Sequence, residues 1–222
     1  MYWHNELMNE YKVMRQFNLD NFSQVGTKKY FEKGELINFK KDKFLVLITE
    51  GRVKVSTINS DGCEKILYIL SNGDWIGEID LFVLENHPYD VCVIEDTVIQ
   101  EISREVMDEM LKKNTEIYPN IIKSIIRKYQ ITSAQLTDNV FEDSAGKIAS
   151  IILRMAEQDG KVIDGYSECF YLKQQDIADL LGCSRVTISR GLNKFKKEGL
   201  LDIKDNRIII LNKSKLETYK HN

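Results

Sequence analysis

The stretch Gln174–Arg190, QQDIADLLGCSRVTISR, has the features of a helix-turn-helix. Ile177 and Leu181 are four residues apart and give the first helix an apolar face. Ala178 is small enough to let a second helix approach closely. Gly182 permits the sharp turn between the helices, because glycine adopts positive φ without strain.

The second helix of this motif has an inward and an outward face. Ser184 is placed to cap its first turn, and the apolar residues Ile188, Leu192 and Phe195 are spaced to face inward. In helix-turn-helix proteins the N-terminal half of this helix enters the major groove, where arginine donates to guanine and serine donates to base edges or phosphate. The alternative is a solvated surface helix. The predicted DNA contacts are Gln174, Ser184, Arg185, Val186, Thr187, Ser189, Arg190, Lys194 and Lys196.

The segments around the motif extend it to a winged helix. A helix is predicted at Ser144–Glu157 and a short strand at Cys169–Leu172. After the motif, two apolar runs, 200–203 and 208–211, are separated by a polar turn and predict a β-hairpin. A helix, a helix-turn-helix and a hairpin in that order are typical of a winged-helix DNA-binding domain.

The N-terminal half has a different pattern, with short β-rich runs divided by glycines. The turn sequence Asn59–Gly62 is a strong hairpin signal. Strands at this regular spacing predict an all-β sandwich or barrel. The predicted strands include Phe44–Ile48, Arg52–Val55, Ile66–Leu70 and Val91–Ile94, with turns at Gly34, Gly51, Gly62 and Gly73.

Two helices are predicted between the halves: a short one at Arg104–Lys113 and a long one with Pro119 in its first turn. Residues of the long helix recur at alternating intervals of three and four, as in a coiled-coil seam. We therefore predict a parallel dimer helix, and a helix packed on its own domain is the alternative. The seam residues are Ile122, Ile125, Tyr129 and Leu136, with Thr132 and Asn139 in the same repeat.

Composition excludes several classes of protein. The chain of 222 residues is 43% hydrophobic with a net charge of −3, so it is neither disordered nor a polycation. Its four cysteines form no Cys-x-x-Cys pair and its three histidines have no catalytic or metal spacing, so we expect no metal, cofactor or enzymatic activity. With neither a signal peptide nor a membrane-length apolar run in the sequence, we expect a cytoplasmic protein without a membrane partner.

Four segments together resemble the Crp-Fnr family of bacterial regulators over nearly the whole chain. They are Gly73–Phe82, Glu95–Thr97, Lys128–Ser133 and Leu180–Arg190. The resemblance implies an α+β fold: an antiparallel β-roll (jelly roll), a long dimerisation helix and a winged helix-turn-helix. The implied divisions are an effector-sensing domain with an N-terminal helix at residues 1–115, the dimer helix at 116–140 and the DNA-binding domain at 141–222.

The effector is predicted to differ from cyclic AMP. In the cyclic-AMP-binding branch, an Arg-Ser pair after Gly-Glu holds the cyclic phosphate, but Leu84–Asp90 has no arginine and contains the acidic Glu85. The usual iron–sulfur sensor is excluded because no cysteine precedes Cys63, and a haem held by His4, His87 or Cys92 remains an alternative. The candidate pocket residues are Gly77, Glu78, Ile79, His87, Tyr89, Tyr129, Thr132 and Ser133, of which the last three fit the dimer seam equally well.

These features predict a homodimeric transcription regulator that binds double-stranded DNA and a small-molecule effector, and contacts RNA polymerase if it is an activator. Ser189 and Arg190 resemble the serine and arginine of the oxygen-sensing branch, whose half-site is similar to TTGAT. Val186 stands where many relatives have glutamate, so we expect a relaxed third position, TTGAT or TTAAT, in an inverted repeat. A ligand-binding regulatory protein that does not bind DNA is the alternative.

Overall fold

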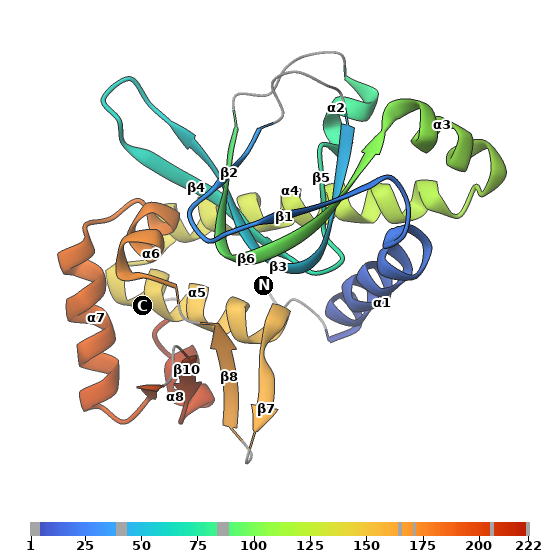
Figure 1. Cartoon of the computed structure of the whole chain (residues 1–222). Coiled ribbons are helices and arrows are strands. Elements are labelled where there is room, and N and C mark those ends of the chain that lie inside the picture. The colour runs from blue at the N-terminus through green and yellow to red at the C-terminus, as the bar shows by residue number, and fades with distance from the viewer. Residues whose placement is uncertain are drawn as a thin grey trace. The chain divides into compact units, whose positions relative to one another are not determined.

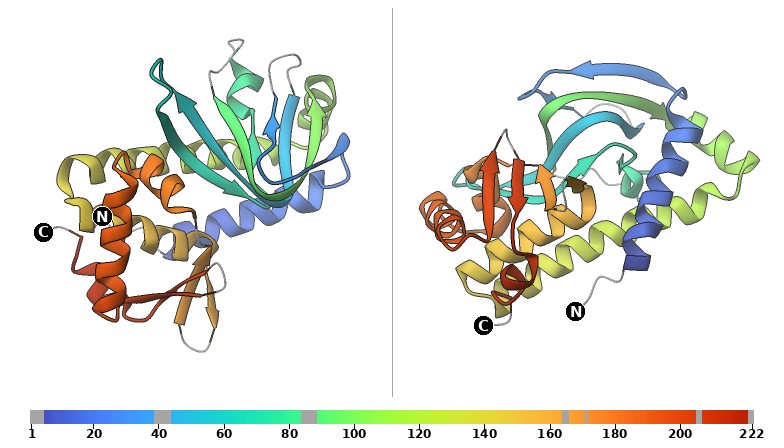
Figure 2. Two further views of the ribbon diagram at one scale, coloured as in Figure 1. Left: turned by 60° about the vertical axis from the view of Figure 1, so that its left-hand side comes forward. Right: turned by 90° about the horizontal axis from the view of Figure 1, so that it is seen from below.

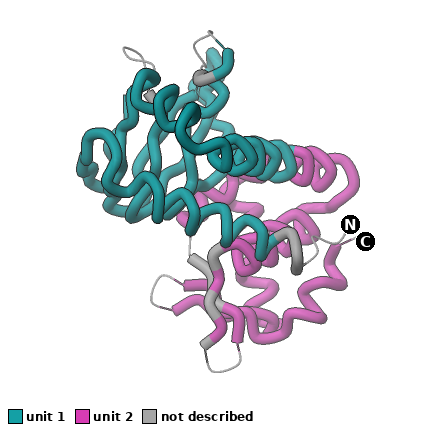
Figure 3. Tube along the Cα trace, turned by 90° about the vertical axis from the view of Figure 1, so that its right-hand side faces the viewer, with its two compact units in different colours: residues 1–132 teal, residues 133–222 magenta. Residues whose placement is uncertain are grey.

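The computed structural model describes residues 5–38, 44–83, 89–163, 166–170, 172–204 and 207–220. The chain divides into two units, residues 1–132 (unit 1) and 133–222 (unit 2), which Figure 3 shows in different colours. The boundary falls inside helix α4 (Ile117–Phe141), so this helix contributes residues to both units. The sequence had suggested a separate central segment, 116–140, in the same place.

Unit 1 is built on an antiparallel sheet in which β1, β6, β3 and β4 lie side by side in that order, while β2 pairs with β6 and β5 with β3 (Figure 1). Helices α1 and α4 cross and contact each other, as Figure 2 shows, and Lys123 of α4 pairs with Glu10 of α1 at 2.6 Å. Before α4 the elements are α1 (Asn5–Phe22), β1 (Thr27–Phe31), β2 (Leu36–Ile37), β3 (Phe44–Ile58), β4 (Glu64–Ser71), β5 (Trp75–Ile76), α2 (Glu78–Phe82), β6 (Asp90–Ser103) and α3 (Arg104–Lys113).

The two longest strands, β3 and β6, correct part of the sequence prediction. The runs predicted as separate strands on either side of Gly51 form the single strand β3, and the register with β6 shifts on both sides of that glycine. Gly51 has φ 87°, and a Cβ there would lie 2.2 Å from the Asp96 carbonyl oxygen. It therefore allows a bulge, not a turn, because only glycine fits this close approach. The hairpin at Asn59–Gly62 is confirmed between β3 and β4.

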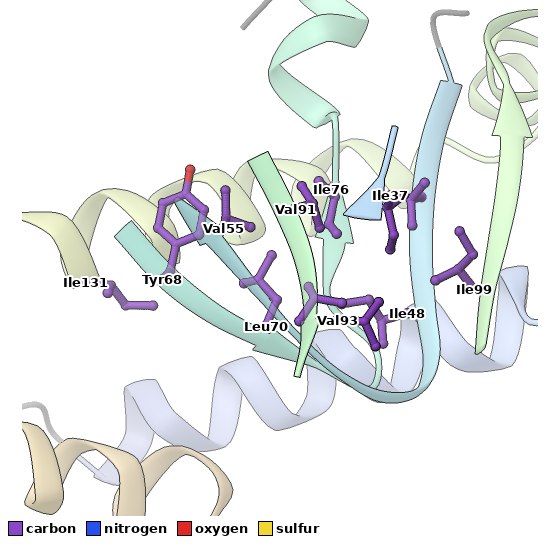
Figure 4. Packing of buried hydrophobic residues seen from close by; sticks show 12 residues of the cluster. Ile37, Ile48, Val55, Tyr68, Leu70, Ile76, Val91, Val93, Ile99 and Ile131 are labelled. Carbon is purple, nitrogen blue, oxygen red and sulfur yellow. The ribbon is translucent and has the colours of Figure 1, made fainter. Parts of the chain in front are cut away.

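Two apolar clusters fill unit 1. The first lies on the inner face of the roll, where alternate residues of the strands point inward, and Ile131 of α4 joins it (Figure 4). The second contains Trp75, whose ring meets that of Phe22 edge-on with centroids 4.9 Å apart. Helices α1, α3 and α4 contribute to this second cluster, which attaches them to the sheet.

Unit 2 is a winged helix-turn-helix, as predicted, and completes the α+β fold. Its sheet has the order β7-β8-β10-β9, and the predicted hairpin appears within one residue of its expected ends. The strand predicted at Cys169–Leu172 begins earlier and pairs with a preceding strand that the sequence did not indicate. The elements after α4 are α5 (Ser144–Asp159), β7 (Lys161–Ile163), β8 (Tyr166–Phe170), α6 (Gln174–Leu181), α7 (Arg185–Lys197), β9 (Leu201–Lys204), β10 (Arg207–Ile210) and α8 (Lys213–Glu217).

Candidate functional site

The turn between α6 and α7 has the predicted geometry. Gly182 ends α6 in the left-handed conformation, with φ 66° and ψ 38°, and its N–H donates to the carbonyl oxygen of Ala178. Ser184 caps α7, since its Oγ accepts a hydrogen bond from the backbone N–H of Thr187 at 3.1 Å. Both roles assigned from the sequence are confirmed.

The inward face of α7 is fixed by close packing. Ile188, Leu192 and Phe195 are buried, as the sequence predicted. A Cβ on Gly191 would lie 2.4 Å from Cδ1 of Ile148, so α7 approaches α5 more closely than a larger residue would allow. This packing determines which residues α7 presents to solvent.

The outward face carries the predicted DNA-reading residues. Ser184, Arg185, Val186 and Arg190 are exposed, and the side chain of Val186 is 56% accessible. The remaining predicted contacts of the motif's N-terminal parts, Gln174, Thr187 and Ser189, are half-buried. An arginine and a small apolar side chain near the N-terminus of an exposed helix are suited to base edges in a major groove.

The C-terminal half of α7 is basic, but its lysines have different surroundings. The ammonium of Lys196 lies 2.7 Å from Asp202 of β9, and Lys204 lies 3.4 Å from the same carboxylate. Hydrogen bonds from Lys196 and from the backbone of Ile203 lower the pKa of Asp202 to about 2. The predicted phosphate contact Lys196 is therefore also a link to the wing.

Lys194 lines an exposed hollow of about 510 Å³ on α7, whose other lining residues are Arg190, Asn193, Lys197 and Glu198. The sequence analysis missed Asn193. The spacing of Arg190, Asn193 and Lys197, at i, i+3 and i+7, is the signal that could have identified this stripe.

In unit 1, Glu78 and Lys128 form a buried ion pair between α2 and α4. The ammonium of Lys128 also donates to the carbonyl oxygen of Trp75 at 2.7 Å and lies 5.9 Å from the ring centroid of Tyr68. Ser124, one turn before Lys128, donates to Glu78 at 2.7 Å. The charges of this cluster therefore satisfy each other inside the unit.

A second buried cluster surrounds Asp74. Its carboxylate accepts hydrogen bonds from Arg15 at 3.0 and 2.9 Å, from Arg127 at 2.9 Å and from the backbone N–H of Ser71 at 2.9 Å. Burial favours the neutral acid, but Arg127 and Arg15 outweigh it, so the pKa of Asp74 is lowered. The cluster links α1 and α4 to the turn before β5.

Comparison with known proteins identifies the family. Residues 28–114 match the model of the cyclic nucleotide-binding domain, and residues 146–219 match that of the Crp-like helix-turn-helix domain. The cAMP-activated global transcriptional regulator CRP of Haemophilus influenzae is 30% identical over 185 residues, which cover 82% of each chain. The chain belongs to the Crp-Fnr family of DNA-binding transcription regulators.

Other members of the Crp-Fnr family agree with this assignment. CRP of Salmonella typhimurium is 29% identical over 82% of this chain and 88% of its own length. The structure of FixK2 from Bradyrhizobium japonicum aligns with a TM-score of 0.76 at 18% identity, over 89% of this chain and 98% of that one. CprK in complex with OCPA aligns with a TM-score of 0.69 at 25% identity, over 90% and 92%. The family is non-enzymatic.

The residues predicted for the effector pocket do not all come together. Gly77, with φ 92°, precedes α2, and Glu78 is buried while Ile79 is half-buried. Tyr89 is partly exposed, and Tyr129, Thr132 and Ser133 lie on the exposed side of α4. His87 and the rest of Leu84–Pro88 lie outside the described residues. The sequence analysis missed Ser124, Lys128 and Tyr68, which surround Glu78.

Neither a metal site nor a membrane span is found where the structure is described. Over those ranges, no three His, Cys, Asp or Glu side chains are grouped so that they could hold a metal ion. Of the residues considered for haem, only Cys92 is described, and its thiol lies 3.9 Å from the carbonyl oxygen of Gly34. The described helices also contain no apolar segment long enough to cross a bilayer.

The predicted dimer seam needs one correction. Ile122, Tyr129 and Leu136 are exposed, by 54%, 71% and 66%. Ile125 is partly buried and packs on the second apolar cluster of unit 1, whereas its neighbour Ile126 is 44% exposed. The helix turn places Ile126 in the exposed stripe, which then continues at Tyr129, Ser133, Leu136 and Val140.

Proposed function

We propose that this regulator binds, as a homodimer in the cytoplasm, an inverted DNA repeat with the half-site TTGAT or TTAAT. The observation that carries the proposal is the exposed N-terminal half of α7, where Arg185, Val186 and Arg190 are all accessible. The two half-sites of such a dimer lie about one helical turn, roughly 34 Å, apart.

The side chains of α7 support this choice of bases. Arg190 donates two hydrogen bonds to the O6 and N7 atoms of a guanine, and Ser189 bonds a base edge or a phosphate. Val186 offers only apolar contact, which suits a thymine methyl group and makes no demand for a G·C pair at the third position.

The exposed stripe of α4 supports the dimer. Its apolar members Ile122, Ile126, Tyr129, Leu136 and Val140 recur at the heptad intervals of a two-stranded coiled coil. A row of this length is unusual on a solvated helix, and a second copy of α4 would cover it.

For the effector, we propose a small molecule other than cyclic AMP. The cations inside unit 1 are engaged by its own carboxylates, Lys128 by Glu78 and Arg127 by Asp74. The segment Leu84–Asp90 contains no arginine that could pair with a cyclic phosphate. The residues therefore do not fit the ligand that gives the matching domain its name. When the regulator acts as an activator, RNA polymerase is its further partner.

Selection of bound sequences from random duplex DNA tests the DNA-reading proposal. Wild type should select inverted TTGAT or TTAAT repeats, and Val186→Glu should restrict the third position to G·C by accepting from cytosine N4. Val13→Glu, at an exposed valine of α1, is the matched control and should select the wild-type sites. GC-rich sites, or an unchanged preference for Val186→Glu, would refute this proposal. Failure of wild type to enrich any sequence would favour a regulator that does not bind DNA.

Calorimetry with cyclic AMP and cyclic GMP tests the effector proposal. The chain should give no binding heat at micromolar concentrations, while CRP of Haemophilus influenzae, which is cAMP-activated, serves as the positive control. Micromolar affinity for either nucleotide would contradict the proposal.

A further inference from the structure

Tyr219, which follows α8, makes three contacts with the last turns of α7. Its ring meets the ring of Phe195 at an angle of 64°, with centroids 4.9 Å apart. The ammonium of Lys194 lies 4.7 Å from the centroid of the same ring. Its hydroxyl donates a hydrogen bond to Oε2 of Glu198 at 2.7 Å. One side chain thus contacts an apolar, a cationic and an anionic residue of the recognition helix.

The position of Tyr219 is fixed by elements other than α7. Its backbone N–H donates to the carbonyl oxygen of Leu216, which is fully buried. Its own carbonyl oxygen lies 2.8 Å from the place where a Cβ on Gly146 would be, so this segment closely approaches the start of α5. Tyr219 therefore provides a rigid support for the long side chains of Lys194 and Glu198.

The two charged contacts change the electrostatics of the hollow on α7. The face of an aromatic ring attracts an ammonium group, so Tyr219 restricts the conformations of Lys194 without neutralising it. The hydroxyl binds the carboxylate of Glu198, which is the only acidic residue lining the hollow. Lys194 stays available to an anion, while Glu198 is held by a hydrogen bond.

We propose that Tyr219 is a positioning residue for DNA binding, which holds Lys194 toward a backbone phosphate and holds Glu198 away from it. This inference rests on the proposed function and adds a sequence-independent contact to the base-reading residues of α7. Because phosphates are the same in every site, Tyr219 should affect affinity for all duplexes and leave base preference unchanged.

A double-mutant cycle on the full-length dimer tests the role of the ring. Lys194→Met should flatten the dependence of log Kd on log salt by about 0.9 per protomer. Tyr219→Leu should weaken binding roughly 2- to 5-fold on specific and random duplexes alike. It should cause no further loss in the Lys194→Met background. Tyr166→Leu, at an exposed tyrosine of β8, is the control and should bind as wild type.

A second pair of variants tests the hydroxyl. Tyr219→Phe keeps the ring but releases Glu198, so it should weaken binding, and Glu198→Gln in the same chain should restore it. A purely structural tyrosine would not depend on Lys194 and would not be rescued through Glu198. If Tyr219→Leu does not fold, Tyr219→Met replaces it in the cycle.

The outcomes separate this inference from the proposed function. If wild type binds DNA but Tyr219→Leu costs the same with and without Lys194, or if Glu198→Gln fails to rescue Tyr219→Phe, the positioning role is wrong. If wild type itself does not bind DNA, the proposed function fails first.

Discussion

Helices α4 and α7 each carry adjacent cations, and they use them in opposite ways. In α4, Arg127 and Lys128 are buried and pair with Asp74 and Glu78. In α7, Lys196 and Lys197 are exposed. The difference follows from the apolar residues around them: Ile121, Ile131 and the two cations share the buried side of α4, whereas the buried residues of α7 leave its lysines outside. A basic pair in a sequence is a binding surface only when its helix turns it outward.

The two arrangements also differ in energy. A buried charge costs several kcal/mol unless it is paired and hydrogen-bonded, so each cation of α4 requires its carboxylate. An exposed lysine contributes little to folding and can be exchanged between water, a carboxylate and a DNA phosphate. Changes in the buried pairs of α4 should therefore alter stability, and changes on α7 should alter binding.

Removing the carboxylate of Asp74 should have the largest effect on stability. Asp74→Asn leaves Arg127 and Arg15 without a buried counter-charge, so unit 1 should lose about 3–5 kcal/mol, measured by urea unfolding. Asp61→Asn, in the exposed turn between β3 and β4, should change stability by less than about 0.5 kcal/mol. Equal effects of the two substitutions would show that the cluster does not stabilise the unit.

The same comparison predicts a dependence on pH. The pKa of Asp74 is lowered in the folded state, so its contribution is complete above the unfolded pKa and is lost as pH falls through the folded value. The stabilities of wild type and Asp74→Asn should converge on acidification below about pH 4. A gap that stays constant down to pH 2 would contradict the assignment of the ionised form.

The exposed side of α4 should control assembly. Leu136→Asp places a carboxylate in the proposed seam and should give folded monomers in light scattering, because pairing would bury the charge. Ile125→Asp should instead destabilise unit 1, since Ile125 packs on its apolar cluster. A folded Leu136→Asp dimer would exclude this stripe as the interface.

On α7, Arg190→Ala should cost about 1–3 kcal/mol of specific binding and relax base preference at one position. Its stability should remain near that of wild type because Arg190 is exposed. Competition binding with single-base variants of the selected site measures both effects. A uniform loss over all variants would show that Arg190 contacts phosphate and not a base.

The contrast between the two helices also explains what the sequence could predict. The turn at Gly182, the cap at Ser184 and the inward face of α7 follow from local patterns, and they are confirmed. The family resemblance likewise predicted both parts of the fold. Gly51 was misread because a bulge and a turn require the same positive φ, and only the pairing with β6 distinguishes them.

Long-range contacts were not visible in the sequence. Lys128 pairs with Glu78, which is 50 residues away, and no local spacing connects them. Tyr219 reaches Glu198 across 21 residues through α8, whose fold decides the contact. The heptad pattern placed the seam but not its phase, because Ile125 and Ile126 are both isoleucine and only packing on the second cluster separates them.

The smallest expected effect concerns Lys196 and the wing. Lys196 shares Asp202 with Lys204, so DNA phosphates must compete with this carboxylate for its ammonium. Lys196→Ala should therefore weaken binding to all sequences alike, but less than Lys194→Met does. It should also raise the pKa of Asp202 from about 2 toward the ordinary 3.8, without reaching it, because Ile203 and Lys204 still donate to the carboxylate. An NMR titration of the Asp202 carboxyl carbon measures this shift, with Lys197→Ala as the matched control. An Asp202 pKa that stays at about 2 would show that Lys196 does not hold the wing, and its full charge would then belong to the DNA surface.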